Sequence, residues 1–343
     1  MNLRRLGTVI ALELTQRVRS IAWYVLLGVF AVLLIGVTTL SFLAASGQPD
    51  AGGTVFSIIV YFVLLLVVLV SPTLSGNAIN GDRDAATLAP VQVTLTTTTE
   101  IVLGKFIAAW IAGLAFAVVA VPFIVIAMIA GGVSPAVAVV SLVMLIVEIG
   151  VVAAIGVGLS GILARPLFSV ASTYLIVAAL VVGTVIAFSL SGLAIRSELT
   201  TQSRDPNFDD KGNTTSCGAW HTETSEQPRF DKVWWMLAPN PFVILADATP
   251  ASYDADGYPL DAFSGLKASV RQAQIAPPAH VRYDNCSDAQ PDPPSPKTIE
   301  AETAPSWLVG LGIQIVLAGG LLVWGTARTR TPARRLPRGT RIA

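Results

Sequence analysis

Long runs of apolar residues alternate with shorter polar segments along most of the chain. About twenty consecutive apolar residues in a helix are enough to cross the hydrocarbon core of a bilayer. Six runs reach that length, and five of them contain no ionisable side chain. The pattern therefore predicts an all-α polytopic membrane protein with six transmembrane helices, at residues 21–45, 55–75, 106–130, 135–164, 167–195 and 305–327.

The first twenty residues have the pattern of an amphipathic helix ahead of the first apolar run. Four apolar residues repeat at i, i+4 spacing and would share one helix face: Leu6, Ile10, Leu14 and Val18. The charged residues Glu13, Arg17 and Arg19 lie elsewhere around the same helix. A helix of this kind is expected to lie along the membrane interface. In the alternative, residues 1–20 simply extend the first transmembrane helix.

Two polar segments between the apolar runs are long. Residues 76–105 contain the charged cluster Gly81-Asp82-Arg83-Asp84, then Thr87 and Leu88, then a threonine run. Thr97 and Glu100 fit a capping box that opens the helix of the third span. This loop is longer than most connections, and long ordered loops tend to be functional, although a plain soluble connector would also fit.

The second long segment, residues 196–304, holds both cysteines, both histidines and twelve prolines. Its helical periodicity is weak, so we expect a loop-rich external domain between the fifth and sixth spans. The run at 233–243 is much more apolar than its surroundings. It is expected either at the outer membrane interface or in the core of this domain.

Composition and charge support a membrane protein and define its orientation. Of the 343 residues 53% are hydrophobic and 13% charged, and a formal net charge of zero argues against nucleic acid as a partner. The N-terminus, the 76–105 loop, the turn after the fourth span and the basic tail at 328–343 carry thirteen Lys and Arg residues. The opposite short loops carry none. Both termini are therefore predicted to be cytoplasmic, and the acidic 196–304 segment external.

Three residues are candidates for specific chemistry. Cys217 and Cys286 are the only cysteines and would lie on the oxidising side, which favours a disulfide. Their spacing to His221 and His280 leaves a metal site as the alternative, although the tight zinc pattern is missing and no metal is assigned. Glu148 is the one ionisable residue inside a predicted span. It is either a polar group in a translocation path or a carboxyl that locks helices together.

Catalytic motifs are missing from the sequence. No G-x-x-x-x-G-K-[ST] phosphate loop occurs, and no HExxH or GxSxG motif either. We therefore expect no enzymatic activity and no cofactor in this chain, so that any energy must come from a partner or an ion gradient.

Three features resemble the membrane subunit of an ATP-binding cassette exporter of the ABC-2 type. Residues 13–20 before the first span are similar to the family's amphipathic elbow helix. The stretch INGDRDAATL at 79–88, followed by EIVLGK at 100–105, resembles the family's segment leading into the third span, with Asp82 where the family usually has Glu. Six spans with a large element between the fifth and sixth complete the resemblance, which covers nearly the whole chain.

The resemblance implies a permease of the bacterial plasma membrane that does not itself hydrolyse ATP. It would pair with a second permease subunit, identical or homologous, and dock cytoplasmic ATPase subunits that bind ATP and Mg²⁺. The loop at 76–105 would act as the coupling segment. The residues expected to contact the ATPase are Gly81, Asp82, Arg83, Asp84, Thr87, Leu88, Glu13, Arg17 and Arg19. The substrate would be hydrophobic or amphipathic: a drug, a lipid or a lipid-linked glycan. The alternative is an ATPase-coupled sensor or scaffold whose external domain binds an envelope component or a partner protein.

Overall fold

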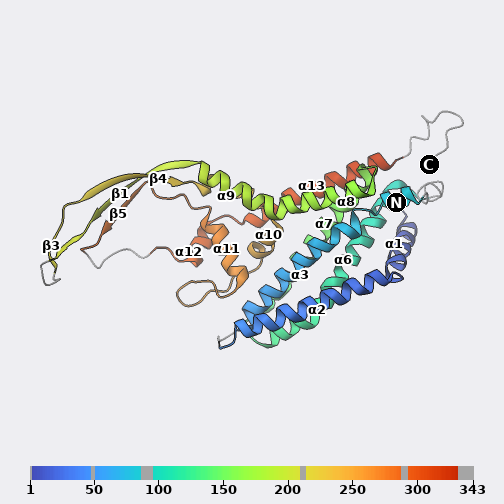
Figure 1. The fold of residues 1–343 in the computed structure, drawn as a ribbon, viewed down its shortest axis with the longest axis horizontal. Coiled ribbons are helices and arrows are strands. Elements are labelled where there is room, and N and C mark those ends of the chain that lie inside the picture. The colour runs from blue at the N-terminus through green and yellow to red at the C-terminus, as the bar shows by residue number, and fades with distance from the viewer. Residues whose placement is uncertain (1, 48–50, 86–95, 209–213, 287–292, 331–343) are drawn as a thin grey trace.

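The computed structural model describes residues 2–47, 51–85, 96–208, 214–286 and 293–330. The chain is mostly helical, and the described part has six helices long and apolar enough to cross a membrane, as the sequence predicts. They are α2 (Ile21–Ala44), α3 (Ala51–Ser75), α6 (Thr98–Ile129), α7 (Pro135–Ile162), α8 (Pro166–Ala178) continued by α9 (Thr184–Ala194), and α13 (Ser306–Thr329). A π-helical turn at Ala179–Gly183 joins α8 to α9. The six form an elongated bundle, compatible with a multi-pass membrane protein (Figure 1).

Helix α7 forms the centre of the bundle. It packs against α3, α6, α8 and α13, and every residue from 148 to 161 is buried. At its closest approach to α13, a Cβ on Gly158 would lie 2.7 Å from the backbone carbonyl carbon of Leu321. Small residues at such positions let two helices pack backbone to backbone. The outer helices, by contrast, expose many large apolar side chains, as expected of surfaces that face lipid.

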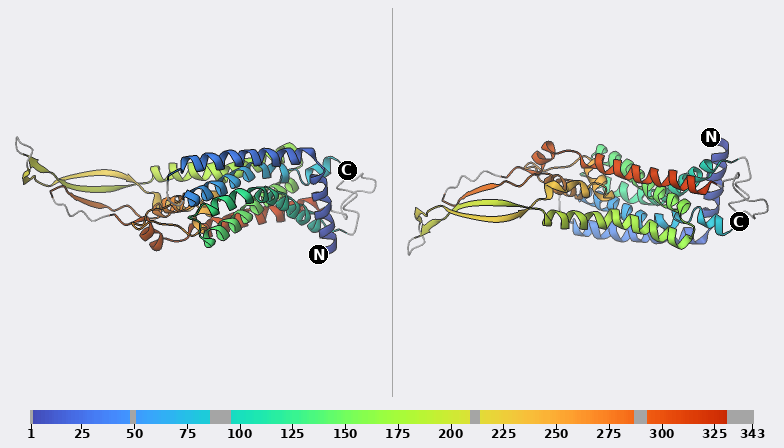
Figure 2. Two further views of the ribbon diagram at one scale, coloured as in Figure 1. Left: turned by 90° about the horizontal axis from the view of Figure 1, so that it is seen from below. Right: turned by 90° about the horizontal axis from the view of Figure 1, so that it is seen from above.

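Helix α1 (Leu3–Val18) lies across the ends of the spanning helices (Figure 2). The Asn2 side chain caps it by accepting a hydrogen bond from the Arg4 amide. Leu6 is buried against α6, next to Gly104. Val18, at the other end of the predicted apolar row, is exposed. The chain turns after Arg19, so α1 is a separate helix and does not extend α2. We call this the α1 end of the bundle.

Residues 196–304 contain more regular structure than the loop-rich segment that the sequence predicts. Strand β1 (Arg196–Arg204) pairs antiparallel with β4 (His221–Pro228) and parallel with β5 (His280–Asp284), in the order β4-β1-β5. A short hairpin of β2 (Pro206–Phe208) and β3 (Thr214–Cys217) follows β1. This sheet projects from the bundle on the side opposite α1, at what we call the sheet end (Figure 1). The expectation of an all-α fold is therefore wrong for this segment.

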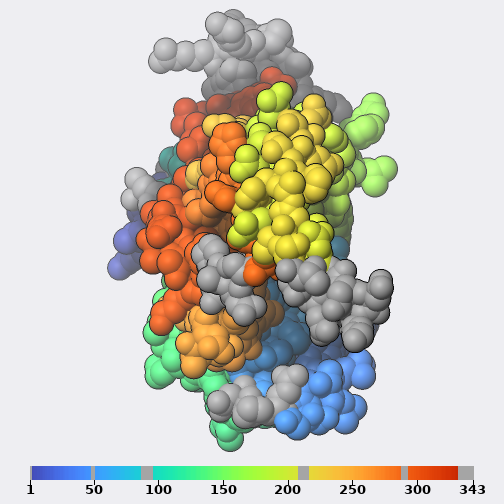
Figure 3. Space-filling model, turned by 90° about the vertical axis from the view of Figure 1, so that its left-hand side faces the viewer, coloured from blue at the N-terminus to red at the C-terminus, as the bar shows by residue number. Residues whose placement is uncertain are grey.

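Three short helices lie between the sheet and the bundle: α10 (Pro241–Ala248), α11 (Ala262–Gln272) and α12 (Pro296–Glu302). Figure 3 looks from the sheet end and shows the yellow residues of β4 and the orange residues of α11 and α12 in front of the bundle. The apolar run at 233–243 leads into α10, which packs against α7, α11 and α13. Asn240 caps α10 and donates hydrogen bonds to Val181 O (2.8 Å) and Thr184 Oγ1 (3.0 Å). The run therefore joins the bundle itself.

Candidate functional site

A buried lysine holds three elements together at the α1 end of the bundle. Helix α6 begins with the predicted capping box, which is confirmed: Thr97 accepts from the Glu100 amide, and Glu100 accepts from the Thr97 amide. Two turns later Lys105, only 3% exposed, forms ion pairs with Glu13 of α1 and with Asp82 Oδ2 at 2.7 Å. Asp82 belongs to the short helix α4 (Asn80–Asp84). One cation thus bridges two carboxylates from different helices.

Arg83 attaches α4 to the end of α7. Its guanidinium donates to Leu163 O (3.3 Å) and Gly161 O (3.2 Å), which are carbonyls of the last turn of α7. Helices leave their final carbonyls without partners, and an arginine at the C-terminus satisfies them favourably. Ser160 completes the attachment, since its hydroxyl accepts from the amides of residues 79 and 80 at 2.9 and 3.1 Å. Arg83 also reaches Thr329 of α13 at 3.4 Å.

Arg17 makes the corresponding contact with α3. Its guanidinium donates to Leu74 O at 2.8 Å, one residue before α3 ends. Burial lowers the pKa of this guanidinium, and the nearby Glu13 carboxylate opposes that shift. Helix α1 is therefore fixed to α3 and α6 through its own charged side chains.

The remaining predicted contact residues lie differently. Arg19 and Asp84 are exposed and have no ion pair among the described residues, while Gly81 lies beside Asn77. Thr87 and Leu88 fall outside the described residues. The cluster thus divides into an inner set, Glu13, Arg17, Asp82 and Arg83, that binds helices together, and an outer pair, Arg19 and Asp84, that is exposed. We call the whole set the bundle-end cluster.

Glu148 lies in the middle of the bundle without a partner. Its side chain is fully buried in α7, and neither carboxylate oxygen has a hydrogen bond in the described part of the chain. The side chain of Gln314 on α13, 1% exposed, is close enough to interact electrostatically with the Glu148 carboxyl. Gln314 donates to Pro239 O at 3.0 Å, and its own Oε1 is also without a partner. The structure therefore brings together unpaired buried oxygens from α7 and α13, and both interpretations of Glu148 stay open.

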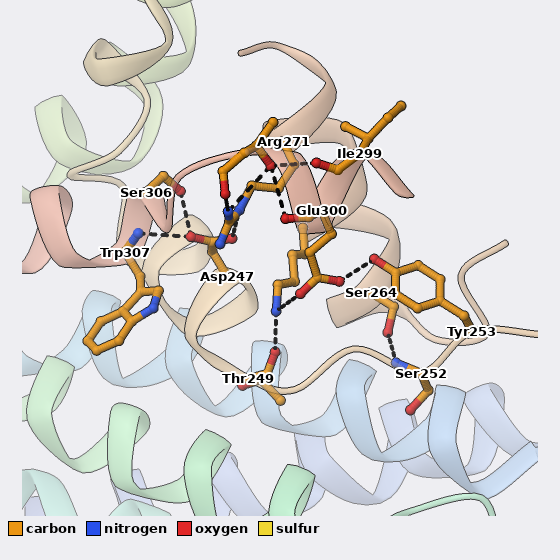
Figure 4. A network of polar contacts seen from close by, with 12 residues as sticks. Asp247, Thr249, Ser252, Tyr253, Ser264, Arg271, Ile299, Glu300, Ser306 and Trp307 are labelled. Atoms are coloured by element: carbon orange, nitrogen blue, oxygen red, sulfur yellow. Dashed lines mark hydrogen bonds and ion pairs between the residues drawn. The ribbon is translucent and has the colours of Figure 1, made fainter. Parts of the chain in front are cut away.

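A second buried ion-pair network holds the short helices to the start of α13 (Figure 4). Asp247 of α10 is completely buried and accepts from Arg271 Nε (2.6 Å), Ser306 Oγ (2.8 Å) and the Trp307 amide (2.9 Å). A carboxylate at a helix N-terminus satisfies free amides and interacts favourably with the helix dipole. Arg271 also donates to Thr303 O at 2.7 Å.

The same network continues through Glu300 of α12. Lys267 pairs with it at 2.6 Å, and the Tyr253 hydroxyl donates to it at 2.6 Å. Burial raises the pKa of Glu300, but the hydrogen bonds from Lys267 and Tyr253 outweigh burial and hold the pKa below its usual value. Every charge in this network has a partner, so its role is to anchor α10, α11 and α12 to α13.

The predicted disulfide between Cys217 and Cys286 is confirmed, with the two Cα atoms 6.0 Å apart. It links the end of β3 to the turn after β5. No group of three or more candidate metal ligands occurs among the described residues. Beside the disulfide, the guanidinium of Arg282 stacks on the ring of Trp220 at 3.9 Å.

Sequence reasoning missed several residues of these sites. Lys105 ends the EIVLGK stretch, yet one partner, Glu13, lies 92 residues away on α1, and the other, Asp82, lies on a separate short helix. Gln314 is a polar residue within an apolar run, and this position alone could have marked it as a buried polar group of the bundle. Asp247 and Arg271 sit in a charged segment where nothing local distinguishes them.

No protein-family model and no curated protein matches this chain. Function must therefore be inferred from the chain's own residues.

Proposed function

We propose that the chain is the permease subunit of an ABC-2-type exporter that moves a hydrophobic or amphipathic substrate outward. ATP hydrolysis would take place on separate cytoplasmic ATPase subunits, because this sequence contains no phosphate loop. The six apolar helices, with a helix lying across one end of them, support this proposal. In it α1 is the elbow helix, the α1 end is cytoplasmic, and the sheet end is external.

The observation that carries the proposal is the Lys105 junction. A partner that pushes on α4 or α1 acts on a loosely attached element unless these are fixed to the spanning helices. Lys105 fixes both to α6, and Arg83 fixes α4 to α7 and α13. In this proposal a displacement at this end would be delivered to three spanning helices through ion pairs and hydrogen bonds, a contiguous network of the kind that can carry energetic coupling.

Exposed charge at the same end supplies the docking contact. Arg19 and Asp84 are opposite in sign, so each would meet a complementary charge on the ATPase. The inner cluster residues act in this proposal by positioning α1 and α4. A second permease subunit, identical or homologous, would complete the translocation path in the bacterial plasma membrane.

In the test, the tagged full chain is purified from its native cells into lipid nanodiscs, and the ATPase activity that co-purifies with it is measured. We expect a co-purifying polypeptide with a phosphate loop, and we expect the paired charge reversal Arg19→Glu with Asp84→Lys to abolish both its binding and the hydrolysis. The matched control reverses Asp256, an exposed charge of the sheet end, and should retain both. Hydrolysis and binding that persist in the Arg19 and Asp84 variant would refute the proposed docking site.

The projecting sheet favours one second candidate, an ATPase-coupled sensor or scaffold that binds an envelope component or partner protein. Ser203 and His221 are paired across β1 and β4, so a two-residue Asn-Gly turn can replace residues 204–220 and close the ribbon. Cys286→Ser removes the thiol left unpaired by this deletion. If the shortened variant loses envelope binding while efflux stays intact, the sensor role is favoured. If it keeps both envelope binding and efflux, the sensor role is excluded.

A further inference from the structure

Two polar side chains meet in the middle of the bundle, and together they lack a hydrogen-bond donor. Glu148 of α7 is fully buried, and Gln314 of α13 is 1% exposed. The side-chain nitrogen of Gln314 donates to Pro239 O at 3.0 Å. Both carboxyl oxygens of Glu148 and Oε1 of Gln314, by contrast, have no partner in the described part of the chain. Three buried oxygen acceptors therefore share no donor, and buried acceptors without a donor are costly.

The packing of α7 against α13 places these two side chains at nearly the same depth. Gly158 lies against Leu321, and three residues later in α7 Gly161 lies against Gly325, so the two helices run in the same direction. The glutamine precedes Leu321 by seven residues, which is two turns, and therefore lies on the face of α13 that meets α7. The glutamate precedes Gly158 by ten residues, so the axial offset between the two is about 4.5 Å. The amide interacts electrostatically with the carboxyl at this separation.

No neighbouring charge balances an ionised Glu148 in the described structure. Helices α3, α6, α8, α10 and α13 pack against α7. They carry these titratable residues: Tyr61, Glu100, Lys105, Tyr174, Asp247 and Arg328. None of them forms a hydrogen bond or an ion pair with Glu148 in the described part of the chain, and Lys105 and Asp247 are paired with other charges. An ionised carboxylate here would be an isolated charge within the spanning part of the bundle, which is the most expensive way to bury this side chain.

A metal ion would need more ligands than these two side chains supply. Glu148 and Gln314 provide three unpartnered oxygens, whereas Ca²⁺ takes about six to eight oxygen ligands and Mg²⁺ about six. A proton needs only one acceptor, and it converts the carboxyl from an acceptor into a donor. It is therefore the cation that this pair of side chains can hold.

We propose that Glu148 is a proton-binding site of the bundle, held as the neutral acid, whose hydroxyl donates a hydrogen bond to Oε1 of Gln314. The proton comes from the solvent and removes the charge of the carboxyl. The new donor serves the glutamine oxygen, so the bond joins α7, the centre of the bundle, to α13. Ionisation at alkaline pH returns the proton to the solvent and leaves a buried charge beside that oxygen, which weakens the contact. This site does not depend on the exporter proposal.

The test records infrared spectra of the full chain in lipid nanodiscs as the pH is raised from neutral to alkaline. A neutral carboxylic acid has a carbonyl stretching band that a carboxylate lacks. Ordinary Asp and Glu side chains ionise near pH 4 and so contribute no acid band above neutral pH. In the wild type we expect an acid band at neutral pH that disappears at alkaline pH while a carboxylate band grows. Both changes should be absent in Glu148→Gln, and the amide band of the same spectra reports whether each variant keeps its helices.

Two further variants separate the proton site from a general effect on packing. Gln314→Met keeps an unbranched side chain but removes the acceptor, so the acid band should shift to higher frequency. Glu300→Gln is the matched control, because it removes a carboxyl that is already paired with Lys267 and should leave the acid band unchanged. Wild-type and Glu148→Gln spectra with the same acid region at neutral pH would overturn the proposal. An acid band that persists at alkaline pH would overturn the release of the proton, and one that Gln314→Met does not shift would overturn the bond to Gln314.

Discussion

Replacing Lys105 by methionine tests whether the buried ion pairs attach α1 to the bundle. The substitution keeps an unbranched side chain in the same space but removes the ammonium that lies between Glu13 and Asp82, which are 17% and 32% exposed. Removing one partner of a buried pair costs about 3–5 kcal/mol. Because Asp82 is nearly one-third exposed and can be rehydrated, we take the lower end and expect a loss of about 3 kcal/mol.

Hydrogen exchange of the α1 amides measures this loss locally. An opening free energy lower by about 3 kcal/mol speeds exchange by roughly 150-fold, since each 1.4 kcal/mol is a factor of ten. The triple variant Glu13→Gln, Asp82→Asn, Lys105→Met removes all three charges and should recover most of the protection, because a neutral replacement of a buried ion pair is often tolerated. Exchange of α1 that stays within about twofold of wild type in Lys105→Met, or a triple variant as unprotected as the single one, would refute the electrostatic attachment.

Three further substitutions test other parts of the structure. Glu148→Gln is expected to raise the melting temperature in nanodiscs at alkaline pH, because a neutral amide costs less to bury than an unpartnered, ionised carboxylate; a lower melting temperature would show that the carboxyl itself holds helices together. Gly158→Leu should destabilise the α7–α13 contact by about 1–3 kcal/mol, whereas Gly319→Leu, where a Cβ meets nothing within 4 Å, should not; denaturant titration distinguishes the two. Hydrogen bonds from Arg229 hold the pKa of Asp231 below its usual value, so their stabilisation is complete above the unfolded pKa and is lost as pH falls through the lower folded one. Intrinsic tryptophan fluorescence should therefore change below about pH 4, and the change should be smaller in Asp231→Asn.

The spanning helices are predictable because apolar length is a local property of the sequence. Their boundaries are less so. The apolar run of the third span begins at Phe106, whereas its helix α6 begins at Thr98, where the predicted capping box opens it, and therefore includes the charged Glu100 and Lys105. A charged residue normally marks the end of a span. Here the charges are tolerated because Glu100 caps the helix and Lys105 is paired within the bundle end.

The sheet could not be predicted from periodicity. Strands are recognised by alternating apolar and polar residues, which requires one buried face. β4 reads His-Thr-Glu-Thr-Ser-Glu-Gln-Pro and is exposed along nearly all of its length, so it has no such alternation. Its pairing with β1, and the parallel pairing of β1 with β5 about eighty residues later, depend on contacts that local sequence does not record.

The bundle-end cluster was predictable as a group of charged residues, but their roles were not. Asp82 and Arg83 attract attention because charge is rare in this chain. That Arg83 satisfies carbonyls at the end of α7 follows only from the fold, since the contact spans about eighty residues. The structure thus separates residues that were expected to act alike, leaving Arg19 and Asp84 as the exposed ones.

The direct continuation of α9 into β1 has a mechanical consequence. A single residue, Ile195, separates the last residue of the helix from the first of the strand, and the Arg229 amide clamps that junction. Nine residues of strand at about 3.3 Å each make an arm about 30 Å long, so a tilt of α9 by about 10° carries the far end of β1 through about 5 Å. The sheet therefore has the geometry of a lever arm on the sheet end of α9, in which a small tilt of the helix corresponds to a shift of several ångströms at the far end of β1.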